Sequence, residues 1–208
     1  MATEAKQDLA SAIGWVPPAN WPARSRAECK AILTAPGMRF EMEEVDIRGV
    51  RLRTWKNAPP NLRAIALLGQ SHGAREFVIY EDERMTYDAW FRAVVRLAHE
   101  FRARGVKKGD RVALAMRNLP EWPVVFFAAV TIGAICVPLN AWRTGDELAF
   151  GLSNSGTKLL VCDEERWDRL KDRRNDFSCV NHTFVTRAEH PLNGADTLES
   201  VIGTPRQY

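Results

Sequence analysis

Residues 86–140 constrain the fold of this chain more than any other part of the sequence. Apolar side chains recur at helical spacing over residues 87–101, behind Thr86 as an N-cap, and Gly105 suits the left-handed position that ends a helix. A Lys-Lys-Gly-Asp turn then leads into the short apolar run 112–116, which is typical of a strand buried on both faces. The segment therefore predicts an amphipathic helix followed directly by a buried strand.

The same alternation continues to the end of this segment and repeats after it. Pro120 suits the first turn of a second helix, which Gly133 can end, and residues 135–139 form a second apolar run with the character of a buried strand. Thr144 and Glu147 have the spacing of a capping box, which predicts a third helix. That helix should end at Gly156, before a buried strand at 158–162, a charged helix at 163–173 and a strand at 183–186.

Strands that alternate with helices of about a dozen residues indicate parallel pairing with right-handed crossovers. We therefore predict an α/β fold with a doubly wound, mainly parallel sheet and flanking helices. Residues 1–37 suggest an irregular arm with a short helix near 27–33, and the alternation over 40–55 suggests a small hairpin. A helix at 61–70, a strand at 77–80 and a solvated polar turn at 81–84 complete the predicted elements. We place the domain boundary between an arm with its hairpin, 1–52, and an α/β domain, 53–208.

Composition and charge exclude several classes of function. The 208 residues are 46% hydrophobic and 26% charged, as in an ordinary soluble domain, and the formal net charge is only +3. The densest basic cluster, 102–108, falls at a predicted helix C-terminus and turn, where the helix dipole favours cations, so nucleic-acid binding is not indicated. Four cysteines without Cys-x-x-Cys spacing predict a reduced, cytoplasmic setting, and Cys136 and Cys162 are expected to be inert core residues.

One uncharged stretch, residues 122–142, is long enough to cross a membrane. Gly133, Pro138 and Asn140 interrupt it, and a buried helix followed by a buried strand explains all three. We therefore expect no transmembrane segment. The polar N-terminus has no signal-peptide pattern.

The order of several short motifs resembles one known family. An amphipathic helix opened by Thr-Tyr is followed by Gly-Val-Lys-Lys-Gly-Asp-Arg-Val-Ala-Leu at 105–114, Asn-Leu-Pro-Glu-Trp at 118–122 and Ala-Ile-Cys-Val-Pro-Leu-Asn at 134–140. This order is similar to that of the N-terminal region of the AMP-forming acyl-CoA synthetases, which belong to the adenylate-forming superfamily. Residues 55–62 resemble the fatty-acyl branch in particular.

The resemblance implies an enzyme that uses ATP, Mg and CoA to activate a fatty or other carboxylic acid through an acyl-adenylate. It also implies a Ser/Thr/Gly-rich phosphate loop and a C-terminal catalytic lysine, and the sequence up to Tyr208 contains neither motif. We therefore expect an N-terminal portion of such a ligase that is inactive alone, and we assign no catalytic, cofactor-binding or metal residue. The incomplete sheet should expose an edge prone to self-association. The alternative is a stand-alone, non-catalytic α/β module that binds a ligand or a partner.

The only candidates for direct contact with a substrate or with the rest of an enzyme are Asn140, Trp142 and Arg143. They follow the carboxyl end of a predicted strand, where open α/β sheets place their ligands. Residues 151–158 have the glycine spacing of a Walker loop, but the order of Thr and Lys is reversed and a helix end explains the segment better. His72 and His99 each lack a second ligand at metal-binding spacing.

Overall fold

A computed structural model describes residue 19 and residues 23–203, and contacts divide the chain into two compact units, Met1–Pro59 and Pro60–Tyr208. In the first unit, helix α2 (Arg26–Leu33) begins with a capping box between Ser25 and Glu28. Strands β1 (Met42–Ile47) and β2 (Val50–Trp55) pair antiparallel. The predicted short helix and hairpin are confirmed. The boundary that we placed at residue 52 stays a prediction.

The two residues between β1 and β2 explain why this hairpin is tight. Arg48 and Gly49 both have positive φ angles, 54° and 81°, as a two-residue hairpin turn requires. The Gly49 amide also donates to Asp46 Oδ1 at 2.9 Å. The turn is therefore held by local backbone geometry and a local side chain.

The second unit begins with helix α3 (Leu62–Gln70) and an antiparallel pair, β3 (Glu76–Tyr80) and β4 (Glu83–Thr86). The predicted polar turn at 81–84 is wrong in its extent, because only Glu81 and Asp82 separate the strands. Glu83 lies in β4 and is only 8% exposed, so its assignment to a solvated turn is also wrong. A strand of alternating buried and exposed residues as short as this one gives little periodic signal.

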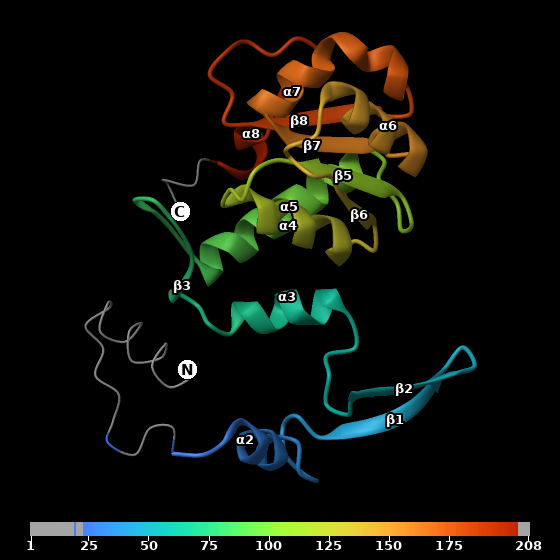
Figure 1. The fold of residues 1–208 in the computed structure, drawn as a ribbon. Coiled ribbons are helices and arrows are strands. Elements are labelled where there is room, and N and C mark those ends of the chain that lie inside the picture. Colours follow the sequence, from blue (N-terminus) through green and yellow to red (C-terminus); the bar gives the residue numbers. More distant parts are fainter. Residues whose placement is uncertain (1–18, 20–22, 204–208) are drawn as a thin grey trace, which may run out of the picture. The chain divides into compact units, whose positions relative to one another are not determined.

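Five parallel strands form the central sheet, in the order β6-β5-β7-β8-β9 (Figure 1). They are β5 (Arg111–Ala115), β6 (Ile135–Pro138), β7 (Leu159–Asp163), β8 (His182–Thr186) and β9 (Asp196–Thr197). Because the chain adds β6 on one side of β5 and β7 on the other, the predicted doubly wound order is confirmed. The burial predicted for β6 is wrong, since this strand lies at the edge of the sheet and Ile135 is 52% exposed.

Helices cover both faces of the sheet (Figure 1). One face packs against α4 (Tyr87–Ala103), α5 (Glu121–Thr131) and α8 (Glu199–Ile202); the other packs against α6 (Gly145–Ser155), α7 (Glu164–Leu170) and the 3-10 helix η1 (Lys171–Phe177). Strand β5 alternates between the resulting cores: Val112 and Leu114 lie in the first, and Ala113 and Ala115 in the second. This alternation makes the middle of the sheet fully buried.

Local signals in the sequence fix the ends of these helices. The Thr86 hydroxyl accepts from the Ala89 amide at 3.1 Å, and Thr144 and Glu147 form the predicted capping box. Gly156 ends α6 with a left-handed φ of 60°. Among the described residues, no helix is long and apolar enough to cross a membrane. The uncharged stretch at 122–142 is instead divided between α5, β6 and the loop that follows.

Candidate binding site at the switch point of the sheet

The strand order creates a crevice beside the carboxyl end of β5. The connection after β5 enters α5 on one face of the sheet, whereas the connection after β6 enters α6 on the opposite face, and such divergence opens a ligand-sized gap in α/β sheets. A pocket of about 780 Å³ lies there. Its walls include the residues that follow four of the strands: Arg117 and Asn118, Asn140 and Trp142, Asp163 and Arg166, and Arg187. We call this cavity the switch-point pocket.

Two of the three residues that we singled out in the sequence line this pocket. The Trp142 amide donates to Asn140 Oδ1 at 2.9 Å, which fixes the turn after β6. The Trp142 ring is 71% exposed, and the Arg117 guanidinium carbon lies 4.2 Å from its centroid. This cation–π pair gives the pocket a flat, amphipathic rim.

Arg143, the third residue, does not line the pocket. Its Nη1 donates to Glu147 Oε1 at 2.8 Å, and its carbonyl accepts from Arg169 Nη1 at 2.7 Å. Hydrogen bonding to the Thr144 amide lowers the pKa of Glu147, so this partner of Arg143 is a stable carboxylate at the start of α6. The structure therefore brings Asn140 and Trp142 together and places Arg143 at a helix start.

Asp163 and Arg166 build the inner wall of the pocket. Asp163 Oδ1 caps α7 by accepting from the Arg166 amide at 3.1 Å, while Oδ2 accepts from the Arg117 amide at 3.0 Å and from Arg166 Nη1 at 3.1 Å. The Arg166 side chain is 1% exposed, and its Nε donates to the Ala141 carbonyl at 2.7 Å. These charge-assisted bonds tie the loops after β5, β6 and β7 to one another. Arg166 Nη2 is buried without a hydrogen-bond partner in the described part of the chain.

Arg187 closes the pocket from the β8 side by joining two buried carboxylates. Its Nη1 and Nη2 donate to Glu83 Oε1 and Oε2 at 3.0 and 2.8 Å, and its Nε lies 3.2 Å from both oxygens of Glu121. Burial raises the pKa of Glu121, whose side chain is 1% exposed, although Arg187 opposes this shift. Burial disfavours the charge on Arg187, but the hydrogen bonds to Glu83 and Glu121 outweigh it and raise the Arg187 pKa.

The geometry of Arg187 is fixed in two further ways. Its backbone φ is 56°, a left-handed value that is uncommon outside glycine, and its guanidinium carbon lies 5.2 Å from the centroid of the Tyr80 ring. We did not single out this residue or Arg117 in the sequence. Arg187 directly follows β8 and Arg117 lies two residues after the end of β5, so the rule that identified Asn140 would have found them. Glu121 belongs to the motif at 118–122, but nothing in that motif marks it as a partner of Arg187, and no comparable signal marks Glu83.

Each described carboxylate of the Glu83–Arg187–Glu121 and Asp163–Arg166 groups is bound to an arginine. These charges therefore hold the loops of the pocket in place. The described residues include no cluster of three or more metal-ligating side chains. The residues at 151–158 also do not fit a nucleotide phosphate, since they are the end of α6, and Arg111 donates to the carbonyls of Ser155 and Gly156 at 2.8 and 2.7 Å. We therefore derive no chemical step with ATP, Mg or CoA from these residues.

Comparison with known proteins defines the class. The family model described as AMP-binding enzyme matches residues 67–202, most of the second unit, and the chain belongs to this family. Similar relatives are crotonobetaine/carnitine–CoA ligases: that of Salmonella paratyphi A is 31% identical over 141 residues, and that of Salmonella typhimurium is 35% identical over 128. The alignments cover 65% and 59% of this chain, but only 27% and 25% of the relatives. The chain thus spans about a quarter of their length.

Solved structures agree with this assignment. The anthranilate CoA ligase AuaEII superimposes with a TM-score of 0.66 over 70% of this chain and 29% of its own, and coronafacic acid ligase from Pectobacterium brasiliense with 0.63 over 71% and 30%. Both are 21% identical and show the fold alone. The N-terminal domain of FACL13 from Mycobacterium tuberculosis is 26% identical, with a TM-score of 0.58 over 68% of this chain and 35% of its own. The resemblance to AMP-forming acyl-CoA synthetases is confirmed.

Proposed function

We propose that this chain supplies the N-terminal α/β layer of an ATP-dependent, AMP-forming ligase that joins a carboxylic acid to CoA. In the complete enzyme, the carboxylate would attack the α-phosphate of ATP to give an acyl-adenylate and pyrophosphate. The CoA thiol would then displace AMP and leave a thioester. The family match over residues 67–202, with relatives named as CoA ligases, carries this proposal. ATP, Mg and CoA would bind to parts of the enzyme outside the residues described above.

The acid would be a fatty acid or another carboxylic acid, and the setting cytoplasmic. Four free thiols, at Cys29, Cys136, Cys162 and Cys179, support a reducing compartment. The motif order at 55–62 favours a fatty acid. The similar relatives are named for crotonobetaine and carnitine, so the panel of acids in the assay should include both short and long acyl chains.

The residues of this chain would position the substrate and contact the rest of the enzyme, and they would not take part in bond formation. Asn140 and Trp142 would touch the acyl group or the rest of the ligase domain. The Trp142 ring supports this role because it is 71% exposed at the rim of the pocket beside Arg117, where its flat face can stack on an apolar group. Arg143 is half exposed on the neighbouring surface and would serve as a contact to the rest of the enzyme.

The first test uses the coding sequence downstream of Tyr208. We expect a Ser/Thr/Gly-rich loop followed by Pro-Lys-Gly, and ATP–pyrophosphate exchange by the product of the uninterrupted coding sequence with a panel of carboxylic acids. The 208-residue chain should show no exchange. Exchange by this chain alone would contradict our assignment of the catalytic parts. A downstream sequence without the loop, together with a 208-residue chain that stays monomeric, would favour the stand-alone module instead.

A second test addresses Trp142 in the same full product. Trp142→Ala should raise the KM for the acid or lower the yield of the assembled enzyme. Leu68→Ala is the control, since Leu68 is also strongly exposed, at 56%, but does not line the switch-point pocket. Equal effects of the two substitutions would show that Trp142 has no special contact.

A further inference from the structure

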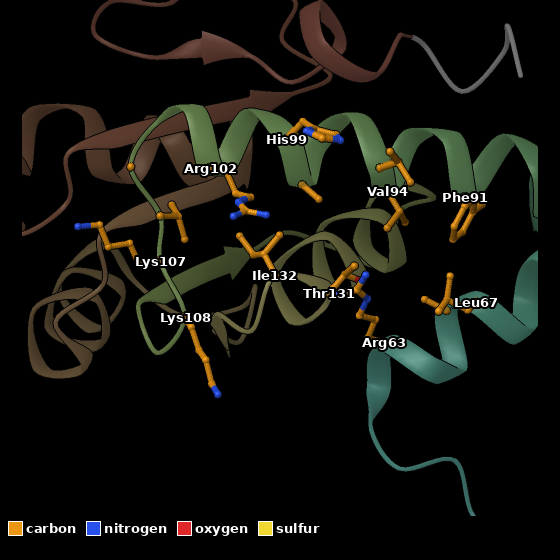
Figure 2. A pocket seen from close by; sticks show the side chains of 15 residues that line it. Arg63, Leu67, Phe91, Val94, His99, Arg102, Lys107, Lys108, Thr131 and Ile132 are labelled. Atoms are coloured by element: carbon orange, nitrogen blue, oxygen red, sulfur yellow. The ribbon is translucent and has the colours of Figure 1, made fainter.

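A second concavity lies between α3, α4 and the end of α5 (Figure 2), with a volume of about 690 Å³. We call it the basic groove. It shares no lining residue with the switch-point pocket. Lys107 and Lys108, which line the groove, precede β5, whereas Arg117, which lines the pocket, follows it. The two cavities therefore lie at opposite ends of the same strand.

The floor of the basic groove is apolar. Helix α4 contributes Phe91, Val94, Val95 and Ala98, and α3 contributes Ala66 and Leu67. Figure 2 shows Phe91 and Leu67 pointing toward each other from the two helices. Val94 is fully buried, but Leu67 is 50% exposed and Val95 37% exposed, so part of this apolar surface faces water. Burying it against an apolar ligand would be favourable at roughly 25 cal/mol per Å².

The ionisable side chains that line the groove are all basic: Arg63, His99, Arg102, Lys107 and Lys108. Among the described residues, no carboxylate lines it. Within the described residues, no ion pair is formed by Arg63, Arg102, Lys107 or Lys108, whereas Arg104 in the next part of the chain pairs with Glu100 and Asp196. The groove thus gathers cations whose charge is not compensated locally.

Helix ends explain only part of this cluster. Arg102 lies in the last turn of α4, where the helix dipole favours a cation. Arg63 lies in the first turn of α3, where the dipole disfavours one. A further sign is the Thr131 hydroxyl in the groove wall, which is buried without a hydrogen-bond partner among the described residues. The solvated-turn interpretation of residues 102–108 does not account for Arg63 or Thr131.

We propose that the basic groove binds a single-chain anionic amphiphile, a carboxylate or phosphate head group on an unbranched apolar chain. The chain would lie along Leu67, Phe91 and Val95, and the head group at Arg102. The side chains of Lys107 and Lys108, which point away from Arg102 in Figure 2, would turn toward the bound head group. The volume suits one ligand of this size. A nucleic acid would leave the apolar floor unused. A second copy of this face would bring the basic residues against one another. This binding goes beyond the ligase activity proposed above and does not depend on it.

Binding is tested on the 208-residue chain with probes that share one chain length and differ in charge. Dodecanoate and dodecyl phosphate, kept below their critical micelle concentrations, are titrated into the protein in a calorimeter. Their binding is compared with that of the cationic probe dodecyltrimethylammonium. We expect one site for each anionic probe, weaker binding at higher salt, and no saturable binding of the cationic probe. Equal binding of the cationic probe would overturn the proposal. Binding to phosphatidylglycerol vesicles without binding of the monomeric probes would also overturn it, in favour of a membrane surface.

Two pairs of surface substitutions locate the site. Arg102→Gln should weaken dodecanoate binding roughly two- to five-fold, and Arg96→Gln, on the same helix but outside the groove, should not change it. Leu67→Ser should weaken it about five-fold, and the equally exposed Leu68→Ser should leave it unchanged. Circular dichroism confirms that each variant is folded. Equal effects within both pairs would show that the amphiphile binds elsewhere and refute the assignment.

Discussion

Arg187→Met should be among the most destabilising single changes in the second unit. Arg187 makes two hydrogen bonds to Glu83 and three contacts within 3.2 Å of the Glu121 carboxylate. The two carboxylates are 7% and 1% exposed, so neither can be rehydrated without moving β4 or α5. Breaking a buried ion pair by removing one partner costs about 3–5 kcal/mol. Because the Arg187 side chain is itself 29% exposed, we expect a loss of about 2–4 kcal/mol in the free energy of unfolding.

The loss should depend on pH in a definite direction. Burial already raises the pKa of Glu121 above its ordinary value of 4.5, and without Arg187 this pKa should rise further. A carboxyl with a raised pKa in the folded state gives stability that is present below its unfolded pKa and lost as the pH rises through its folded pKa. The deficit of Arg187→Met relative to the unchanged chain should therefore be larger near pH 7.5 than near pH 5.

Urea unfolding at these two pH values, followed by circular dichroism, measures this deficit. Arg143→Met is the control, since its pair with Glu147 is about half exposed on both sides and should contribute less than about 1 kcal/mol. The double variant Arg187→Met with Glu121→Gln should recover part of the lost stability, because an amide needs no buried counter-charge. Equal losses for the two arginines, a deficit that does not change with pH, or no recovery in the double variant would each refute this account.

Three further predictions concern the ion pair of the largely buried Asp110 with Lys158, the thiols and a helix end. Asp110→Asn should destabilise the chain near pH 7, because the hydrogen bond from Lys158 lowers the pKa of Asp110 below 3.8; this difference should vanish in urea unfolding as the pH falls through that lowered pKa. Cys136 is half-buried and not the core residue that the sequence suggested, but burial still raises its pKa to about 11, so an aromatic disulfide reagent near pH 8 should label exposed Cys29 quickly and Cys136 more slowly; equal labelling rates would contradict this difference. Gly156→Ala should cost about 1 kcal/mol of unfolding free energy because of the left-handed φ of 60°, and a neutral result in thermal unfolding would contradict that backbone strain.

Helices whose ends carry capping residues or a left-handed glycine could be predicted from the sequence. Thr86, Gly156 and the Thr144–Glu147 capping box each act within four residues along the chain, so their effect is visible without a tertiary structure. The position of β6 was not visible in the same way. Its residues are as apolar as those of a central strand, and only the pairing order of the whole sheet places it at the edge.

The same difference between local signals and tertiary contacts applies to the candidate site. Asn140 and Trp142 could be named as candidates because the carboxyl ends of strands are recognisable in a sequence, and their contact with a substrate stays a prediction. The ion group around Arg187 was missed because its partners Glu121 and Glu83 lie 66 and 104 residues away, and no local pattern indicates that either carboxylate pairs with Arg187. Separations of this size become contacts only when the sheet is assembled.

The two hydrophobic cores have a consequence for how this region folds and unfolds. Each core is built on the same middle strands, with Leu159 and Val161 of β7 facing one and Leu160 and Cys162 facing the other. If these shared strands separate, the helices on both faces therefore lose the surface against which they pack. Paired residues of β5 and β6 lie 24 positions apart in the sequence, from Arg111 to Ile135, and those of β5 and β7 lie 47 positions apart, from Val112 to Leu159, so neither layer can be completed early from local contacts alone. Two cores that share one parallel sheet should melt together, as a single cooperative unit.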